Sequence, residues 1–400
     1  MDIRYLLLFL TGYIVACAIP RFTALYAFSP NRVKPSKTFQ HLFPIGVGIA
    51  LALLYWWEMQ IQAVSLGKTI VPLVINPEPV ETLQLRFAVH AVFFLFLLAA
   101  SYIDFEEMII PDTITIPGTI LGLLFAATLP QTLLPATEMS IDVLSEGLTG
   151  VLYSQDSVPL HIVSSQAWPQ CFSPAPAKAS LFVALGIWWF WCFATMNRVW
   201  YGRLPLRKAF AIFVRYLVRS RTTYLLLGIG AAGSAAIAWM WTTSSPDSLH
   251  WRGLFSSLVG LLAGAMMIWS VRIIGRLTLG REAMGFGDVT LMAMIGTFVG
   301  WQPCILIFFL APLAGLFLGI GRVLLGLGRE LPYGPFLCLG TVFLILFWPQ
   351  CWNFGEPFFS WTELVPTVMF LCLILLGIML WGWRRIKRRM TNGTKLKSLF

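Results

Sequence analysis

The sequence predicts an all-α protein that crosses a membrane many times as a helical bundle. Of its 400 residues, 58% are apolar and only 12% are charged. The apolar residues gather in long runs, and most lysines and arginines lie between these runs. A soluble protein could not bury so much apolar surface, so the runs are expected to be membrane helices.

Eleven apolar segments can be distinguished along the chain. Several are shorter than the roughly 20 residues that span a bilayer as a helix, so some are expected to merge or to be re-entrant. In chain order the predicted segments are residues 5–20, 42–58, 86–103, 114–129, 180–196, 223–241, 253–271, 288–300, 303–321, 335–349 and 363–383.

The distribution of basic residues predicts the orientation of these helices. If the N-terminus lies outside and the segments alternate, 23 of the 28 lysines and arginines fall on the inside, together with a cytoplasmic tail that starts at Arg384. Such an excess is the positive-inside pattern of membrane proteins. The net charge of +10 therefore indicates topology and contact with anionic lipids, and not the binding of nucleic acid.

Five regions follow from these segments. Two of them, each carrying an isolated aspartate, are expected to form the functional core. They are separated by an insertion made of a long outside loop without clear periodicity and an extra transmembrane hairpin. The regions are residues 1–85 with a short cytoplasmic loop, 86–129 with Asp104, 130–252 with the insertion, 253–350 with Asp288, and 351–400 with the last helix and the basic tail.

Two isolated acids stand at the inner ends of apolar segments. Asp104 closes one run, and Pro111 prevents a helix from continuing through the loop that follows. Asp288 opens another run, directly after Gly285 and Gly287, which leave room for a close approach of backbone or substrate. Carboxylates at membrane depth are costly and usually mark function. We therefore expect the two aspartates to meet between helices.

Two carboxylates within reach of each other indicate general acid–base chemistry. Because both cannot ionise cheaply, they share a proton, which is the arrangement of aspartic proteases. One carboxylate would take a proton from an attacking water, and the other would polarise the scissile carbonyl. The four histidines are scattered without ligand spacing, so neither a metal nor another cofactor is expected.

At these residues the chain resembles the prepilin peptidases, the type IV leader peptidase branch of the G-x-G-D intramembrane aspartic proteases. Asp104, followed by Pro111-Asp112, is similar to the first motif of that family. Residues 282–291 resemble the second motif, an acid-rich lead into G-x-G-D that is followed by a basic or polar residue and leucine. Residues 331–336, with the sequence L-P-Y-G-P-F, resemble the P-F-G-P-F segment that lies near the site in such enzymes.

The resemblance implies an aspartic endopeptidase of the bacterial inner membrane. Its partners would be membrane lipids and prepilin or pseudopilin-like substrates, from which it would remove a short basic leader at the cytoplasmic face. The residues that it implies are Asp104 and Asp288 as catalysts, with Gly285, Gly287, Asp112, Glu282, Pro332, Gly334 and Pro335 in support.

The first inside loop departs from the bifunctional members of that family. Those members carry a large loop there with paired C-x-x-C motifs, tied to N-methylation of the new pilin N-terminus. Here the loop has about 20 residues and no cysteine, too few for a separate folded domain. Methyltransferase activity is therefore not expected.

Two other functions compete with leader cleavage. A presenilin or signal-peptide-peptidase relative would cut inside transmembrane helices, but residues 331–336 and the I-I-P-D at 109–112 fit the prepilin branch better. A proton-coupled transporter would also use intramembrane acids. Against a transporter, no internal repeat pairs the two halves of the chain, and both acids lie on one side.

Overall fold

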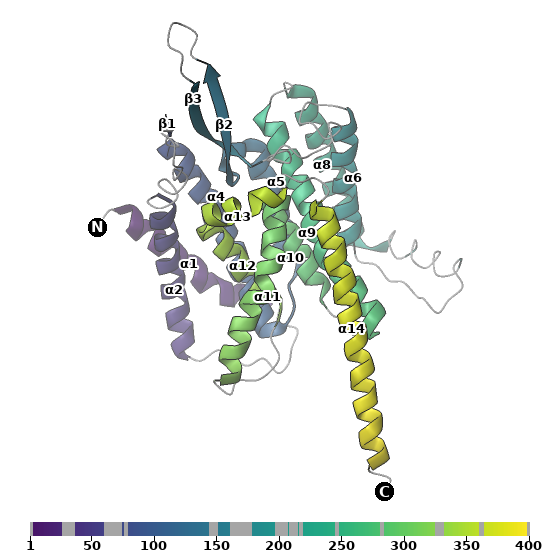
Figure 1. Cartoon of the computed structure of the whole chain (residues 1–400). Helices are drawn as coiled ribbons and strands as arrows, with labels where there is room; N and C mark the ends of the chain where they lie inside the picture. The colour runs from purple at the N-terminus through teal and green to yellow at the C-terminus, as the bar shows by residue number, and fades with distance from the viewer. Residues whose placement is uncertain are drawn as a thin grey trace.

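The protein is a bundle of helices with a small sheet at one end and the C-terminal end of the last helix projecting from the other (Figure 1). The computed structural model describes residues 3–25, 37–59, 74–75, 79–143, 151–160, 178–196, 207, 215, 219–244, 248–280, 284–324, 332–359 and 364–397. The helices are α1 (Ile3–Leu25), α2 (Lys37–Trp57), α4 (Val80–Glu107), α5 (Asp112–Thr128), α6 (Lys178–Thr195), α8 (Arg221–Thr243), α9 (Leu249–Leu279), α10 (Phe286–Val299), α11 (Trp301–Leu324), α12 (Gly334–Leu346), α13 (Trp348–Phe359) and α14 (Leu364–Lys397), with a 3-10 turn, η2, at Pro130–Thr132. The strands are β1 (Val74–Ile75), β2 (Pro135–Val143) and β3 (Val151–Pro159).

These helices confirm the prediction of a multi-pass membrane protein. Ten of the eleven predicted apolar segments lie, to within a residue or two, within one helix each, and the segment 335–349 runs from α12 into α13. In the described ranges, seven helices are long and apolar enough to cross a membrane, or up to eight if α12 and α13, bent by 95°, form one broken span. The apolar helices within α2, α5 and α10 are shorter. A total of eleven crossings therefore stays a prediction, as does the orientation of the termini.

Two strands of the sheet, β2 and β3, lie between α5 and α6 in the sequence, where a loop without periodicity was expected; that expectation was wrong. β2 and β3 pair antiparallel, with Pro135 opposite Pro159 and Val143 opposite Val151, and β1 joins β3 in parallel. The run M-S-I-D-V at 139–143 alternates apolar and polar residues, which favours a strand. Five residues of alternation are too few to stand out within a long polar segment.

The extra hairpin of the insertion consists of α6 and α8. The two helices pack against each other, and α6 also packs against α9. The indole N–H of Trp188 donates to the Gly230 carbonyl at 2.9 Å. A Cβ on Gly233 would overlap the Trp188 ring, so the glycine leaves the space that this ring fills. Most of residues 197–220, which connect these two helices, lie outside the described residues.

Helix α10 lies at the centre of the bundle. Every side chain from Asp288 to Val299 is buried, and the helix packs against α5, α9, α11 and α12. Its 14 residues make about 21 Å of helix, which is less than the roughly 30 Å of a hydrocarbon core. A short helix enclosed by longer ones can hold its first turn, with Asp288, away from lipid.

Glycines allow neighbouring helices to approach α10 at backbone distance. Gly260 on α9 faces Gly296, and a Cβ on either one would collide with the carbonyl oxygen of the other. On the α5 side, Gly118 leaves the space that the Met294 side chain occupies. Small residues are the usual means of close helix packing in membranes. The position of α10 is therefore set by contacts that tolerate no added side chain.

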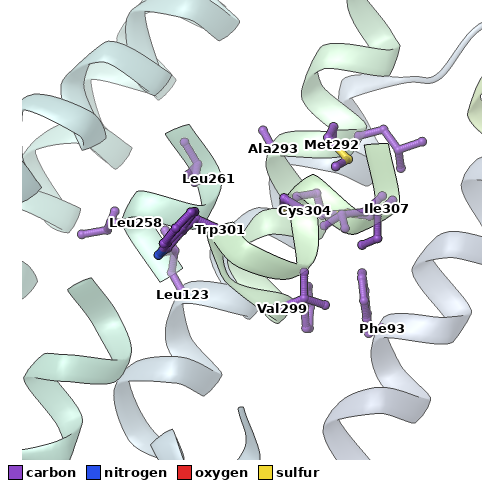
Figure 2. Packing of buried hydrophobic residues seen from close by; sticks show 14 of the residues in the cluster. Phe93, Leu123, Leu258, Leu261, Met292, Ala293, Val299, Trp301, Cys304 and Ile307 are labelled. Atoms are coloured by element: carbon purple, nitrogen blue, oxygen red, sulfur yellow. The ribbon is translucent and has the colours of Figure 1, made fainter. Parts of the chain in front are cut away.

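Large apolar side chains from several helices pack together in the core (Figure 2). Phe93 on α4 stacks on Phe298 with ring centroids 4.2 Å apart. Leu258 and Leu261 on α9 and Met292 on α10 are at most 1% exposed. Between helices in lipid, such contacts stabilise the bundle through van der Waals packing. This core holds α4 and α9 against α10, and the two aspartates lie on α4 and α10.

Candidate active site

Asp104 lies in the last turn of α4. The helix ends at Glu107, and Met108 adopts the left-handed conformation (φ 54°) and donates its N–H to the Asp104 carbonyl at 3.0 Å. The Asp104 side chain is only 4% exposed. The helix therefore stops one turn after the aspartate, and the loop that follows turns back over the site towards Pro111.

The first residue of α12 contacts the Asp104 carboxylate directly. The Gly334 N–H donates to Asp104 Oδ2 at 3.1 Å, across 230 positions of sequence. A Cβ on Gly334 would lie 2.5 Å from that oxygen and 2.8 Å from Ile110 Cδ1. Only glycine lets this N–H reach the carboxylate. Pro335 occupies the next position, where a helix needs no N–H donor.

Asp288 lies in the first turn of α10 and is 8% exposed. A backbone hydrogen bond from Gly285 reaches its carboxylate. The N-terminus of a helix carries partial positive charge, which favours an anion at this position. A Cβ on Gly287 would lie 2.9 Å from Ile110 Cβ, so this glycine lets α10 begin against the loop that follows Asp104.

The structure brings the two predicted aspartates together. Their carboxylates interact electrostatically, although 184 positions of sequence and the whole insertion separate them. Ile110 lies against both Gly287 and Gly334, so one buried residue joins the loop after α4 to the starts of α10 and α12. The result is a pair of buried carboxylates at the meeting point of three helix ends.

The other predicted supporting residues are not all part of the buried surroundings of this pair. Asp112 begins α5 and is exposed, so it is a residue of the loop edge and not of the buried pair. Pro332 is half-buried and precedes the turn into α12. Glu282 falls outside the described residues. Within those residues, no group of three or more His, Cys, Asp or Glu side chains could hold a metal ion.

Two residues of the site were not singled out by the sequence analysis. Tyr333 precedes α12, and burial, followed by the nearby Asp288 carboxylate, raises the pKa of its phenol. Cys338 lies near both aspartates, and its thiol hydrogen-bonds to the Ser101 side chain. In the sequence, Tyr333 lies between Pro332 and Gly334, two expected site residues of the L-P-Y-G-P-F segment, and this position was the available signal. Cys338 lies in an apolar run and carries no such signal.

Both aspartates lie in segments that are similar to a known protein family. A profile of the type IV leader peptidase family matches residues 91–154 and 209–320, which include Asp104 and Asp288. These two segments are therefore similar to the type IV leader peptidase family. Residues 332–336 lie outside this match. The position of Tyr333 and Gly334 beside the aspartates is seen only in the tertiary structure.

Several similar proteins carry the name prepilin leader peptidase/N-methyltransferase. The one from Aeromonas hydrophila is 35% identical over 98 residues, which is 24% of this chain and 33% of the relative. Those from Pseudomonas aeruginosa and Burkholderia pseudomallei are 38% identical over 107 residues and 32% identical over 138 residues, or 24% and 30% of this chain and 36% and 42% of the relatives. The matches thus span about a third to two-fifths of the length of these relatives. No solved structure matches the chain.

Proposed function

We propose that this protein is a membrane aspartic endopeptidase that removes the leader from type IV prepilin-like substrates. The observation that carries the proposal is the meeting of two buried carboxylates, Asp104 and Asp288, at the converging ends of α4, α10 and α12. The leader peptidase match over both aspartates supports the reaction class, and the names of the relatives support the substrate class.

Hydrolysis would use the pair as general base and general acid. A water between the carboxylates attacks the scissile carbonyl and loses a proton to the ionised aspartate. The protonated aspartate donates its proton to the carbonyl oxygen. When the C–N bond breaks, the first aspartate returns its proton to the leaving nitrogen, and the second recovers one from a hydroxyl of the intermediate. Both carboxyl groups end in their starting states.

The site is expected to face the cytoplasm in a bacterial inner membrane. The aspartates lie at the end of the bundle whose connecting segments hold most of the basic residues, and such segments stay inside. A substrate with a basic leader followed by an apolar helix would place its leader in water at this face. Its cleavage bond would then lie at the membrane edge, beside α10.

The proposal covers peptide cleavage and not methyl transfer. The relatives are named for both activities, but their matches cover only 24% to 30% of this chain. The first inside loop is short and has no cysteine. We therefore propose a peptidase whose core consists of residues 86–129 and 253–350, joined by the insertion at 130–252.

Cleavage by single variants tests the proposal. Asp104→Asn and Asp288→Asn, purified as full chains, should each lose leader cleavage while their thermal unfolding stays near that of the wild type. Glu81→Gln, exposed in the first turn of α4 at the opposite end of the Asp104 helix, is the matched control and should cleave normally. Substantial cleavage by either aspartate variant would contradict the proposal.

A further inference from the structure

The two aspartates have unequal surroundings. Asp104 lies at the C-terminal end of α4, where the free carbonyls of the last turn disfavour a negative charge. Asp288 lies at the N-terminal end of α10, where the free N–H groups favour one. The helix ends alone therefore divide the pair into one site suited to a carboxylic acid and one suited to a carboxylate.

A cation stands on the Asp288 side of the pair. Arg272, on α9, places its guanidinium carbon 5.6 Å from the centroid of the Phe286 ring, and Phe286 is two residues before Asp288. The same guanidinium interacts electrostatically with the Asp288 carboxylate. The first turn of α10 itself holds no basic residue, so this charge comes from the neighbouring helix. A cation stacked on an aromatic face is held at a fixed place.

Within the part of the chain that the structure describes, the other titratable groups near Asp288 bring no second positive charge. They are Asp104 from α4, Tyr333 from the turn before α12, and Cys338 from α12. Asp112, at the start of α5, is exposed and would add negative charge. Against this background a single nearby guanidinium changes the balance between the two aspartates.

We propose that Arg272 is a positioning residue that keeps Asp288 as the ionised member of the pair, so that Asp288 is the base and Asp104 the acid. This inference rests on the proposed peptidase function and divides its chemistry between the two residues. Water gives its proton to Asp288 as its oxygen bonds to the scissile carbon, and Asp104 protonates the carbonyl oxygen. The Gly334 N–H bond to Asp104 Oδ2 leaves the other oxygen of that group to carry the acid proton.

The test is the pH dependence of cleavage by the full-length protein in lipid vesicles. The probe is a prepilin with a basic leader and an apolar helix. Arg272→Gln and Arg272→Met remove the cation, Arg272→Lys keeps it, and Arg276→Gln, exposed one turn further along α9, is the matched control. Without the cation a higher pH is needed to remove the shared proton. The acidic limb of kcat/KM should therefore move up by about one pH unit in the neutral variants, a roughly tenfold loss at acidic pH that recovers on raising it.

The outcomes separate this inference from the function on which it rests. Arg272→Lys and Arg276→Gln should keep the wild-type limb. The role of Arg272 would be overturned if the acidic limb of kcat/KM did not move in a folded neutral variant, or if that variant lost cleavage at every pH. In both cases, cleavage by the wild type would still support a peptidase. If the wild type does not cleave, or if Asp288→Asn does, the peptidase function itself is wrong. The two neutral variants keep the test available should one of them fail to fold.

Discussion

Replacing Gly334 by alanine should damage the site, because the added methyl group would meet the Asp104 carboxylate directly. The added Cβ would lie 2.5 Å from Asp104 Oδ2 and 2.8 Å from Ile110 Cδ1, closer than carbon atoms of side chains approach such neighbours. Either the start of α12 or the side chains of Asp104 and Ile110 must therefore move away. The N–H···O bond to Asp104, now 3.1 Å, would then exceed hydrogen-bond distance.

The magnitude follows from that bond. Asp104 becomes a carboxylate when it gives its proton to the carbonyl oxygen. A hydrogen bond to a charged group contributes about 1.5–3 kcal/mol, and a tenfold change in rate corresponds to about 1.4 kcal/mol. If the Gly334 N–H holds the carboxyl group of Asp104 throughout the reaction, Gly334→Ala should lower kcat/KM by roughly 10- to 100-fold. Overpacking of the same position should lower the free energy of unfolding by about 1–3 kcal/mol.

The assay compares this variant with Gly319→Ala on α11. A Cβ on Gly319 would meet nothing within 4 Å, so alanine there should leave cleavage unchanged. It should also raise the free energy of unfolding slightly, because alanine favours a helix over glycine. Leader release is measured by mass spectrometry and unfolding by a thermal scan of the same preparations. Wild-type kcat/KM in Gly334→Ala would refute the assigned contact between α12 and Asp104.

Three further predictions concern the bundle, its topology and the second activity of the relatives. Gly296→Val should prevent α9 from reaching α10 and abolish accumulation of folded protein in the membrane. The control Gly186→Ala, where a Cβ meets nothing within 4 Å, should accumulate normally. Normal accumulation of the valine variant would contradict the close packing of α9 and α10. Cysteine-accessibility labelling should place position 165, in the predicted outside loop, outside and positions 210 and 395 inside. If positions 165 and 210 report the same side, the extra hairpin does not cross the membrane. The purified protein, given prepilin and S-adenosylmethionine, should release the leader and leave the new N-terminus at the mass of the free amine; an added methyl group that depends on this chain would show that the activity resides elsewhere in it.

The location of Asp104 and Asp288 could be predicted from the sequence because a carboxylate at the end of an apolar run is rare and costly. The same holds for Gly285 and Gly287, whose lack of a side chain has meaning only next to a buried acid. Both aspartates lie where the predicted helices end and begin, since apolar runs and helix-stopping prolines are local signals.

Local signals failed for the sheet and for the neighbours of the aspartates. The strands β2 and β3 gain their stability by pairing with each other, so each one alone leaves only a short alternation in the sequence. Tyr333 and Arg272 resemble, in the sequence, a loop aromatic residue and an ordinary charge near a helix end. Neither has a local pattern that relates it to Asp288.

The sequence by itself determined the membrane helices, the family resemblance and the two acids, because hydrophobicity, charge bias and short motifs are carried by residues close together in the chain. The tertiary structure decided which groups reach those acids. Gly334 donates to Asp104 across 230 positions, and Arg272 reaches Asp288 from a neighbouring helix. These contacts depend on how closely α9 and α12 pack against α4 and α10. Glycine at the helix contacts sets that distance, and only the packed bundle reveals it.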